Sequence, residues 1–317
     1  MSGITDAPFR RMAAELGAGL VVSEMTASED LAQGLRRSQL RCEAAGIGPH
    51  VVQLAGCEAR WMSEGAKIAA DGGADIIDIN MGCPARHVTG GQSGSALMRD
   101  LDHALTLIEA TVAAVDIPVT LKMRLGWDDR SLNAPDLARR AQAAGVQMIT
   151  VHGRTRCQFY KGDADWQAVR AVRDATSLPL VVNGDITSFT RAVDALKQSG
   201  ADAVMIGRGA QGQPWLPGQI GRRLQSGIAE LAPKLGVQLS YISRLYDELL
   251  THYGLRVGLR HARKHLGWAL DVAAQTSAVP IDALKHWRGV ILTAEEPAVV
   301  QQSLQAAFDD FAWRSAA

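Results

Sequence analysis

Cys83 is the residue with the clearest capacity for chemistry, because it lies in the segment 75–84, DIIDINMGCP, where a short apolar run leads into Gly-Cys-Pro. It stands close to Asn80, and the Gly-rich stretch 90–94 allows the following loop to move. A thiol in such a loop is expected to act as an acid or a nucleophile. A metal site is not predicted, because no cysteine or histidine stands at a usable spacing. The other cysteines are interpreted as small buried apolar residues: Cys42, Cys57 and Cys157.

Polar or ionisable groups also end each of seven short apolar runs. Any one of them has an ordinary explanation, such as a helix cap, a solvated charge or a satisfied buried histidine. If the runs are strands of a parallel barrel, however, their C-terminal ends converge on one face, where such barrels carry their active sites. The residues are Glu24, Gln53, Asn80, Lys122 with Arg124, His152 with Arg154, Asn183-Gly184-Asp185 and Gly207-Arg208.

Two of these exits are Gly-rich turns, NGD at 183–185 and GRGAQG at 207–212. Each opens a predicted helix, whose first N–H groups can bind an anion together with the guanidinium of Arg208. The alternative is a pair of ordinary tight turns. The arginine favours a phosphate site.

The segment 254–268 contains no acidic residue. At helical spacing its cations fall on one face and its apolar residues on another. A solvated cationic face and a contact with nucleic-acid phosphates are both compatible with this stripe. The cations are Arg256, Arg260, Arg263 and Lys264, and the apolar residues are Leu255, Leu259, Ala262 and Leu266.

The elements that must position these residues alternate between strand and helix. Strands are predicted near 20–24, 50–54, 75–80, 118–124, 147–152, 179–183 and 202–206, and helices near 58–72, 93–115, 135–144, 165–175 and 187–198. Alternation of this kind predicts βαβ units and a parallel sheet. We predict an α/β fold of the (β/α)8 TIM-barrel type whose first strand is missing before residue 1. An open doubly wound sheet is the alternative, but its G-x-G-x-x-G turn is absent.

The pattern becomes wholly helical after about residue 237. We therefore predict a catalytic barrel domain at 1–232 and a small all-α domain at 237–317. The 317 residues are 47% hydrophobic, which is ample for a large core. Lys+Arg and Asp+Glu both number 33, so overall charge does not indicate a nucleic-acid partner. Four scattered cysteines and the lack of a leader or a membrane-spanning run predict a cytoplasmic protein.

Several motifs together resemble the tRNA-dihydrouridine synthases, most closely the bacterial B-type enzymes. The resemblance covers nearly the whole chain and departs from the family at the front, where the first strand and its flavin loop are absent up to Met1. The motifs are MSGITD at 1–6, VQL at 52–54, INMGCP at 79–84, LKMRLGW at 121–127, VHGRT at 151–155, Tyr160-Lys161-Gly162, Asp165-Trp166, VVNGDI at 181–186, MIGRGAQGQPW at 205–215 and RHARKH at 260–265.

The resemblance implies an enzyme that binds FMN, takes a hydride from NADPH and reduces the C5=C6 bond of a uridine in the D-loop of tRNA. Cys83 matches the family's proton donor. Asn80 and Arg124 are placed to hold the uracil edge, with Arg154 and Tyr160 as further candidates, and the basic stripe becomes a tRNA contact. The implied FMN-binding residues are Met1, Ser2, Gln53, Lys122, His152, Asn183, Gly184, Asp185, Gly207 and Arg208.

Two other functions fit parts of the pattern. A flavin enzyme acting on a free pyrimidine, like dihydroorotate dehydrogenase, would share the phosphate site without needing the basic helix. A non-catalytic RNA-binding barrel would keep the helix and lose the flavin. We expect a monomer without metal or membrane attachment, while the target uridine and any regulation cannot be predicted from the sequence.

Overall fold

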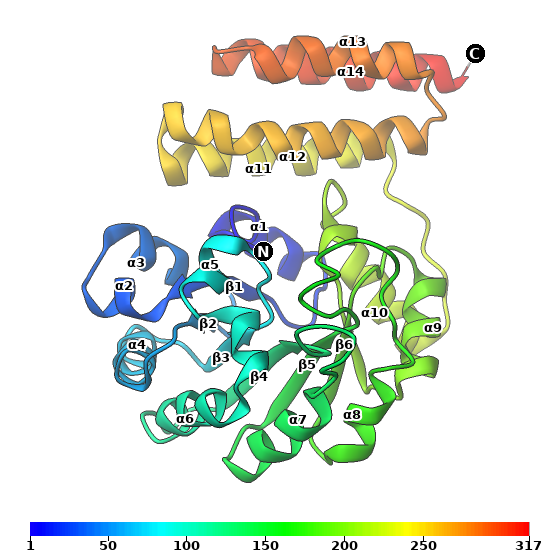
Figure 1. Cartoon of the computed structure of the whole chain (residues 1–317). Helices are drawn as coiled ribbons and strands as arrows, with labels where there is room; N and C mark the ends of the chain where they lie inside the picture. The colour runs from blue at the N-terminus through cyan, green and yellow to red at the C-terminus, as the bar shows by residue number, and fades with distance from the viewer. Residues whose placement is uncertain (317) are drawn as a thin grey trace. The chain divides into compact units, whose positions relative to one another are not determined.

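A computed structural model describes residues 1–316 of the chain, and its framework is a parallel sheet of seven strands (Figure 1). The strands are short and rich in Val, Ile and Leu, with most side chains buried, as expected for a sheet covered on both faces. They pair in chain order, and β1 and β7 are the two edges within the described residues. The predicted TIM-barrel type of fold and its seven strands are confirmed. The strands are β1 Val22–Ala27, β2 Val51–Ala55, β3 Ile76–Met81, β4 Val119–Arg124, β5 Met148–His152, β6 Leu180–Asn183 and β7 Ala203–Met205.

The prediction that the first strand ends at Glu24 is wrong. β1 continues through Ala27, because Met25, Thr26 and Ala27 pair with β2 after an irregularity in the register. Glu24 therefore lies within the strand, where its side chain accepts a hydrogen bond from the N–H of Gly3.

Helices of the barrel lie outside the sheet (Figure 1). The predicted helix at 93–115 is in fact two elements, because Asp100 has an extended backbone and its side chain caps a new helix by accepting from the N–H of His103. The predicted helix at 165–175 is shorter and begins at Arg170. The helices are α1 Ala7–Glu15, α2 Ser28–Ala32, α3 Arg36–Cys42, α4 Ala59–Asp71, α5 Arg86–Gly90, α6 Leu101–Val112, α7 Ala134–Ala143, α8 Arg170–Ala175 and α9 Phe189–Ser199, with 3-10 turns η1 Gly94–Arg99 and η2 Arg208–Ala210.

The strand register aligns the polar residues of neighbouring strands. Asn80 is paired with Lys122, and His152 is paired with both Arg124 and Asn183. Because side chains alternate between the two faces of a strand, residues two apart share a face. The register therefore places the predicted site residues of β3 to β6 on one face, in two successive layers near the C-terminal ends of the strands. Asn80 and Lys122 share one layer, and Arg124, His152 and Asn183 share the next. We call this end of the barrel the mouth.

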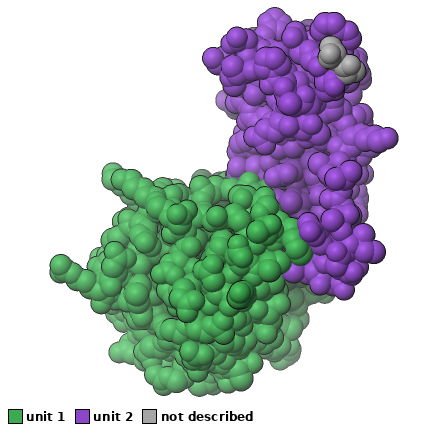
Figure 2. Space-filling model, turned by 90° about the vertical axis from the view of Figure 1, so that its right-hand side faces the viewer, with its two compact units in different colours: residues 1–10, 20–209 green, residues 11–19, 210–317 purple. Residues whose placement is uncertain are grey.

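The chain divides into two compact units (Figure 2). The first contains residues 1–10 and 20–209, and the second contains residues 11–19 and the chain from 210 onward. The helix α10 thus groups with the second unit, although the sequence placed residues up to 232 with the barrel. The remaining helices of this unit are α10 Leu216–Ser226, α11 Leu235–Tyr253, α12 Leu255–Thr276, α13 Ile281–Thr293 and α14 Pro297–Ala316.

Close packing of α11 against α12 requires glycine at position 258. A Cβ built there would lie only 2.6 Å from the carbonyl oxygen of Leu249. The two helices bury Leu249, Leu259 and Leu266 between them and their neighbours. The segment that carries the basic stripe is therefore a fixed element of a helical unit.

Candidate active site

The loop that carries Cys83 is held by side-chain and backbone hydrogen bonds. Asn80 Oδ1 accepts from the backbone N–H groups of Gly82, at 3.0 Å, and of Cys83, at 2.9 Å. The carbonyl oxygen of Cys83 accepts from the N–H and the hydroxyl of Ser95, at 3.1 and 2.9 Å. These contacts fix the half-buried Cys83 at the mouth, next to β3.

Gly94 is required by the packing of this loop. Its φ is +59°, and an added Cβ would lie 2.8 Å from the carbonyl oxygen of Cys83. The sequence suggested that glycines let the loop move. The structure gives Gly94 a different task, which is to let η1 approach the backbone of Cys83.

His152 is neutral and has one defined tautomer. Asn183 Nδ2 donates to the carbonyl oxygen of Met205, so Asn183 Oδ1 must accept from His152 Nδ1–H, at 2.9 Å. The opposite ring nitrogen, Nε2, lies 3.3 Å from Arg154 Nη1 and accepts from it. Burial, together with the positive charges of Lys122 and the nearby arginines, lowers the pKa of His152 to about 2.

Lys122 is a cation of the mouth that has no partner among the residues that the structure describes. Within residues 1–316 its ammonium group makes no hydrogen bond and no ion pair, although the residue is half-buried. Burial and the charge of Arg124 lower the pKa of Lys122 to about 8, while Asp78 and Cys83 oppose this change. A half-buried cation with unused donors is suited to bind an anionic or strongly polar ligand.

Arg124 is buried, and its donors are largely used by the protein. Its Nε donates to the carbonyl oxygen of Gly82, and its Nη1 donates to those of Thr155 and Phe159, each at 2.8 Å. This pattern favours a role in fixing the loops around the mouth, and the expected contact with uracil stays a prediction.

Arg154 is held in a similar way. Its guanidinium group forms an ion pair with Asp185 and donates to the carbonyl oxygens of Lys161, at 3.2 Å, and Gly162, at 2.6 Å. The predicted contact with uracil would have to compete with these bonds. The side chain clearly ties the loop after β5 to the turn after β6.

The turn after β6 packs closely against the turn after β7 and against the loop after β5, because two positions lack a Cβ. An added Cβ at Gly209 would lie 2.4 Å from the carbonyl oxygen of Ile186. Gly184 has a φ of +115°, and an added Cβ would lie 2.8 Å from the Cβ of Ala164. The close approach brings both Gly-rich turns to one position at the mouth, as the sequence predicted.

These turns present donors without acceptors. In the described part of the chain, the N–H groups of Gly184, Asp185 and Gly207 donate no hydrogen bond within the protein. The side chain of Arg208 is half exposed and lies 3.1 Å from Asp185. The Asp185 carboxylate accepts from both Arg154 and Arg208, so an anion here would meet backbone N–H groups and Arg208 rather than that carboxylate. Such a set of donors fits a phosphate group.

The comparisons with known proteins identify the family of this chain. Residues 1–311 match the family model described as dihydrouridine synthase. The chain belongs to the dihydrouridine synthase family. It is 57% identical over 309 residues to a probable tRNA-dihydrouridine synthase of Rhizobium leguminosarum bv. phaseoli, covering 98% of this chain and 93% of that one. It is 43% identical to tRNA-dihydrouridine synthase B of Xanthomonas campestris pv. campestris over 298 residues, covering 94% and 87%.

Among solved structures, histamine dehydrogenase from Rhizobium sp. 4-9 aligns with a TM-score of 0.50 at 16% identity, over 83% of this chain and 47% of that one. This similarity concerns the fold alone. Among the described residues of this dihydrouridine synthase family member, no helix is long and apolar enough to cross a membrane. The same residues contain no group of three His, Cys, Asp or Glu side chains arranged to hold a metal ion.

Three further predicted site residues of the synthase lie at the rim of the mouth. Tyr160 is 46% exposed, and the guanidinium carbons of Arg124 and Arg208 lie 5.4 and 5.0 Å from its ring centre. Met1 lies near the turn after β7, since a Cβ at Gly207 would be 3.6 Å from its sulfur. Ser2 is exposed.

The stripe on α12 is only partly as predicted. Arg256 and Arg260 are exposed, whereas Arg263 and Lys264 are half-buried, and Arg263 donates to the carbonyl oxygen of Ala294. On the apolar face, Leu259, Ala262 and Leu266 are buried. Leu255, the first residue of α12, is 65% exposed.

Sequence reasoning missed two features of the synthase's mouth. Asp78 is a buried carboxylate hidden in the apolar run of β3, and it accepts from Gln53 and Thr120. Trp127, in the loop after β4, has the guanidinium carbons of Arg99 and Arg156 at 4.6 and 4.7 Å from its ring centre. An acid within the apolar segment IIDI was the one available signal for Asp78.

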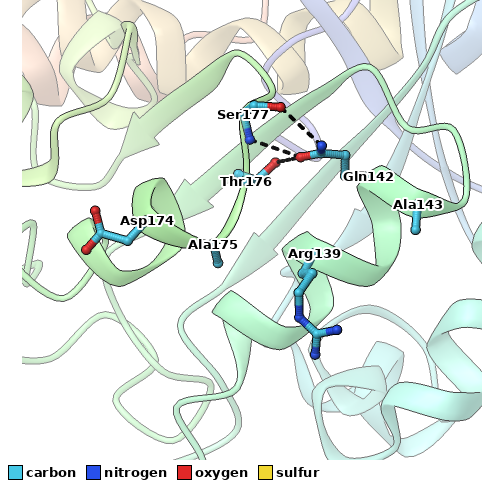
Figure 3. Close-up of a pocket in the computed structure, with 7 residues that line it drawn as sticks. All are labelled: Arg139, Gln142, Ala143, Asp174, Ala175, Thr176 and Ser177. Carbon is cyan, nitrogen blue, oxygen red and sulfur yellow. Dashed lines mark hydrogen bonds between the residues drawn. The ribbon is translucent and has the colours of Figure 1, made fainter.

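A separate surface hollow lies between α7 and α8 (Figure 3). Gln142 crosses it and accepts from Thr176 and Ser177. These helices end there and lead into the N-terminal ends of β5 and β6, which are opposite to the mouth. The hollow is therefore not the candidate active site of the synthase. Its lining residues are Arg139, Gln142, Ala143, Asp174, Ala175, Thr176 and Ser177.

Proposed function

We propose that this protein is an FMN-dependent tRNA-dihydrouridine synthase that uses NADPH to reduce the C5=C6 bond of a D-loop uridine. The observation that carries the proposal is the position of Cys83, whose backbone N–H is held by Asn80 at the mouth. The same mouth carries the ammonium of Lys122, which has no hydrogen-bond partner among the described residues, and the donor-rich turns after β6 and β7. Family membership and the names of the relatives support reduction of a uridine in tRNA.

The residues of the mouth fit FMN. The N–H groups of Gly184, Asp185 and Gly207, with Arg208, would hold its phosphate, while Gln53, Lys122 and His152 would contact the isoalloxazine ring. Met1 and Ser2 belong to the same proposed site. When bound and reduced by NADPH, the flavin supplies a hydride for uracil C6. The ammonium of Lys122 would stabilise the negative charge of the reduced ring, and the neutral His152 would leave that task to Lys122.

Cys83 would complete the reduction as a general acid. Addition of hydride to C6 places negative charge on C5 and O4 of uracil, because C6 is conjugated with the C4 carbonyl. The thiol then gives its proton to C5 from the opposite face of the ring and becomes a thiolate. Asn80 would act by holding the backbone of Cys83 in place, in addition to the predicted contact with uracil.

A uridine inside folded tRNA must swing out of its stack to reach the mouth. Recognition would then depend on the shape and the backbone of the RNA. We assign this task to the helical domain, predicted as 237–317, with Arg256 and Arg260 as its exposed phosphate contacts, and catalysis to the barrel, predicted as 1–232. All four cysteines are free, which suits the cytoplasmic location that we propose.

The interpretation of Cys157 as a buried residue is wrong, because it is exposed in the loop after β5, while Cys42 and Cys57 are half-buried. The test is the variant Cys83→Ala, with Cys157→Ala as the matched control at an exposed position. Cys83→Ala should keep its FMN and its reduction by NADPH, yet form dihydrouridine in unmodified tRNA roughly 10²- to 10⁴-fold more slowly, the range for general acid catalysis. Cys157→Ala should match the unmodified enzyme. Normal product formation by Cys83→Ala would remove the thiol from the mechanism.

Two results would redirect the assignment. Reduction of a free pyrimidine at the rate found with tRNA would favour an enzyme of small-molecule metabolism. Purified protein that binds tRNA but contains no flavin and cannot take it up would favour a non-catalytic RNA-binding barrel.

A further inference from the structure

A chain of hydrogen bonds leads from Cys83 to a carboxylate inside the barrel. The N–H of Cys83 donates to Asn80 Oδ1 at 2.9 Å, and Asn80 Nδ2 donates to Gln53 Oε1 at 2.7 Å. Gln53 Nε2 then donates to Asp78 Oδ2 at 2.7 Å, and the hydroxyl of Thr120 donates to Asp78 Oδ1 at 2.6 Å. Asp78 is only 3% exposed.

The strand register produces this arrangement. Gln53, Asp78 and Thr120 are paired across β2, β3 and β4 and form one row inside the barrel. Asn80 lies two residues further along β3, on the same face and one layer closer to the mouth. Gln53 connects the two layers, because its oxygen faces Asn80 and its nitrogen faces Asp78.

The direction of every bond in this chain is determined by its ends. A backbone N–H can only donate, so the atom of Asn80 that faces Cys83 must be its oxygen. Its nitrogen must then face Gln53, and Gln53 must in turn offer its oxygen to Asn80 and its nitrogen to Asp78. Only a hydrogen-bond acceptor at position 78 completes this series of hydrogen bonds. A carboxyl group supplies an acceptor whether or not its other oxygen carries a proton.

We infer that Asp78 is a positioning residue for the reaction: by fixing the orientation of both amides, it holds the backbone of Cys83 in the place from which the thiol can reach the uracil ring. The inference rests on the proposed function. Gln53 belongs to the proposed flavin site, so the same chain also couples the position of the cofactor's ring to that of the proton donor. Without an acceptor at position 78, Gln53 can rotate, and Asn80 loses the partner that keeps its oxygen on the loop.

The first test compares Asp78→Leu with Asp78→Asn in the full-length holoenzyme. Leucine removes the acceptor, so the Gly82 and Cys83 amides should exchange their hydrogens roughly tenfold faster, and tRNA should oxidise the reduced flavin roughly 10- to 100-fold more slowly. Asparagine can still accept from Gln53 while donating to the hydroxyl of Thr120, so it should restore most of the amide protection. Thr120→Val is the matched control, because it removes the other donor to Asp78 and leaves the chain to Cys83 intact.

A second test exchanges the hydrogen-bond donor and acceptor groups of positions 78 and 80, and it applies even if Asp78→Leu does not fold. In Asn80→Asp, the carboxylate turns an acceptor toward Gln53 Oε1, and Gln53 cannot donate to both carboxylates in the observed geometry. Combining Asn80→Asp with Asp78→Asn lets Gln53 rotate by half a turn and satisfies every group again. The two bonds of Gln53 are then reversed, while the N–H of Cys83 still donates to the side chain at position 80. The double variant should therefore melt at a higher temperature than Asn80→Asp alone and should react faster with tRNA.

Strictly additive effects in this double-mutant cycle, or unchanged amide exchange in a folded Asp78→Leu protein, would refute the role of Asp78. Failure of the proposed function looks different. In that case the unmodified holoenzyme makes no dihydrouridine, whereas amide exchange and melting temperatures still report on the hydrogen-bond chain.

Discussion

Lys122 provides a quantitative prediction, because its charge has no partner among residues 1–316. The prediction concerns Lys122→Met, which keeps the length of the side chain and removes the ammonium group. The drop of the pKa from 10.5 to about 8, at about 1.4 kcal/mol per pKa unit, corresponds to about 3 kcal/mol against the charged form. Since the residue is only half-buried, we expect a gain of roughly 1–3 kcal/mol in the free energy of unfolding of the flavin-free variant at pH 7.

The pH dependence follows from the same change. Below pH 8 both the folded and the unfolded chain carry the proton, and the folded chain bears the full cost of the buried charge. Between about 8 and 10.5 the folded Lys122 is neutral while the unfolded lysine is still protonated, so the stability of the unmodified protein rises with pH. The advantage of Lys122→Met should accordingly shrink through this range.

The assay is chemical denaturation of the flavin-free proteins between pH 7 and 10, followed by titration with oxidised and reduced FMN. Lys67→Met, at an exposed position of α4, serves as the control and should leave the stability unchanged. Lys122→Met should also bind reduced FMN more weakly relative to oxidised FMN, because the reduced ring is the anionic one. A variant less stable than the unmodified protein at pH 7, or a stability difference that does not change with pH, would contradict this reasoning.

Two further predictions concern other parts of the chain. Charge reversal at two exposed positions, Arg256→Glu and Arg260→Glu, should weaken tRNA binding without changing the flavin content. The slope of the logarithm of the tRNA-binding constant against the logarithm of the salt concentration should fall in magnitude by about 2. An unchanged slope would argue against a role of the basic stripe in tRNA binding. Gly209→Val should lower the FMN content of the purified protein, because its Cβ would lie 2.4 Å from the carbonyl oxygen of Ile186 and push the two turns apart; absorbance at flavin wavelengths measures this directly.

The strands could be predicted from the sequence because each is a short run of branched apolar residues bounded by glycine or proline. The positions of β2 to β7 agree with the prediction to within one or two residues. The error in the end of β1 arises because the length of a strand depends on the partners that the neighbouring strand offers, as well as on the local sequence. β1 continues past Glu24 because β2 offers partners as far as Ala55, and a sequence pattern does not contain that information.

The site was predictable as a set of strand ends, but not as a set of interactions. Lys122, Arg124 and Arg154 are all cations near the mouth, and their residue types give them the same expected role. The structure separates them by their acceptors, since the two arginines are held by carbonyl oxygens and by Asp185, while the described residues offer Lys122 no partner. A guanidinium group with five donors suits a tie between loops, and a single ammonium group left unpaired suits a ligand.

Asp78 shows why the deepest layer of the site escapes sequence reasoning. An acid within an apolar strand has two opposite interpretations, a solvent-facing residue of an amphipathic strand or a buried group with dedicated partners, and only the register decides between them. Here the register places Gln53 and Thr120 as donors on either side of the carboxylate. Burial raises the pKa of Asp78, so the two donors must offset the cost of placing a carboxylate there. A hydrophobic residue would fill that space at a lower free-energy cost of burial. It would, however, leave the amides of Gln53 and Asn80, and with them the loop of Cys83, without a fixed orientation.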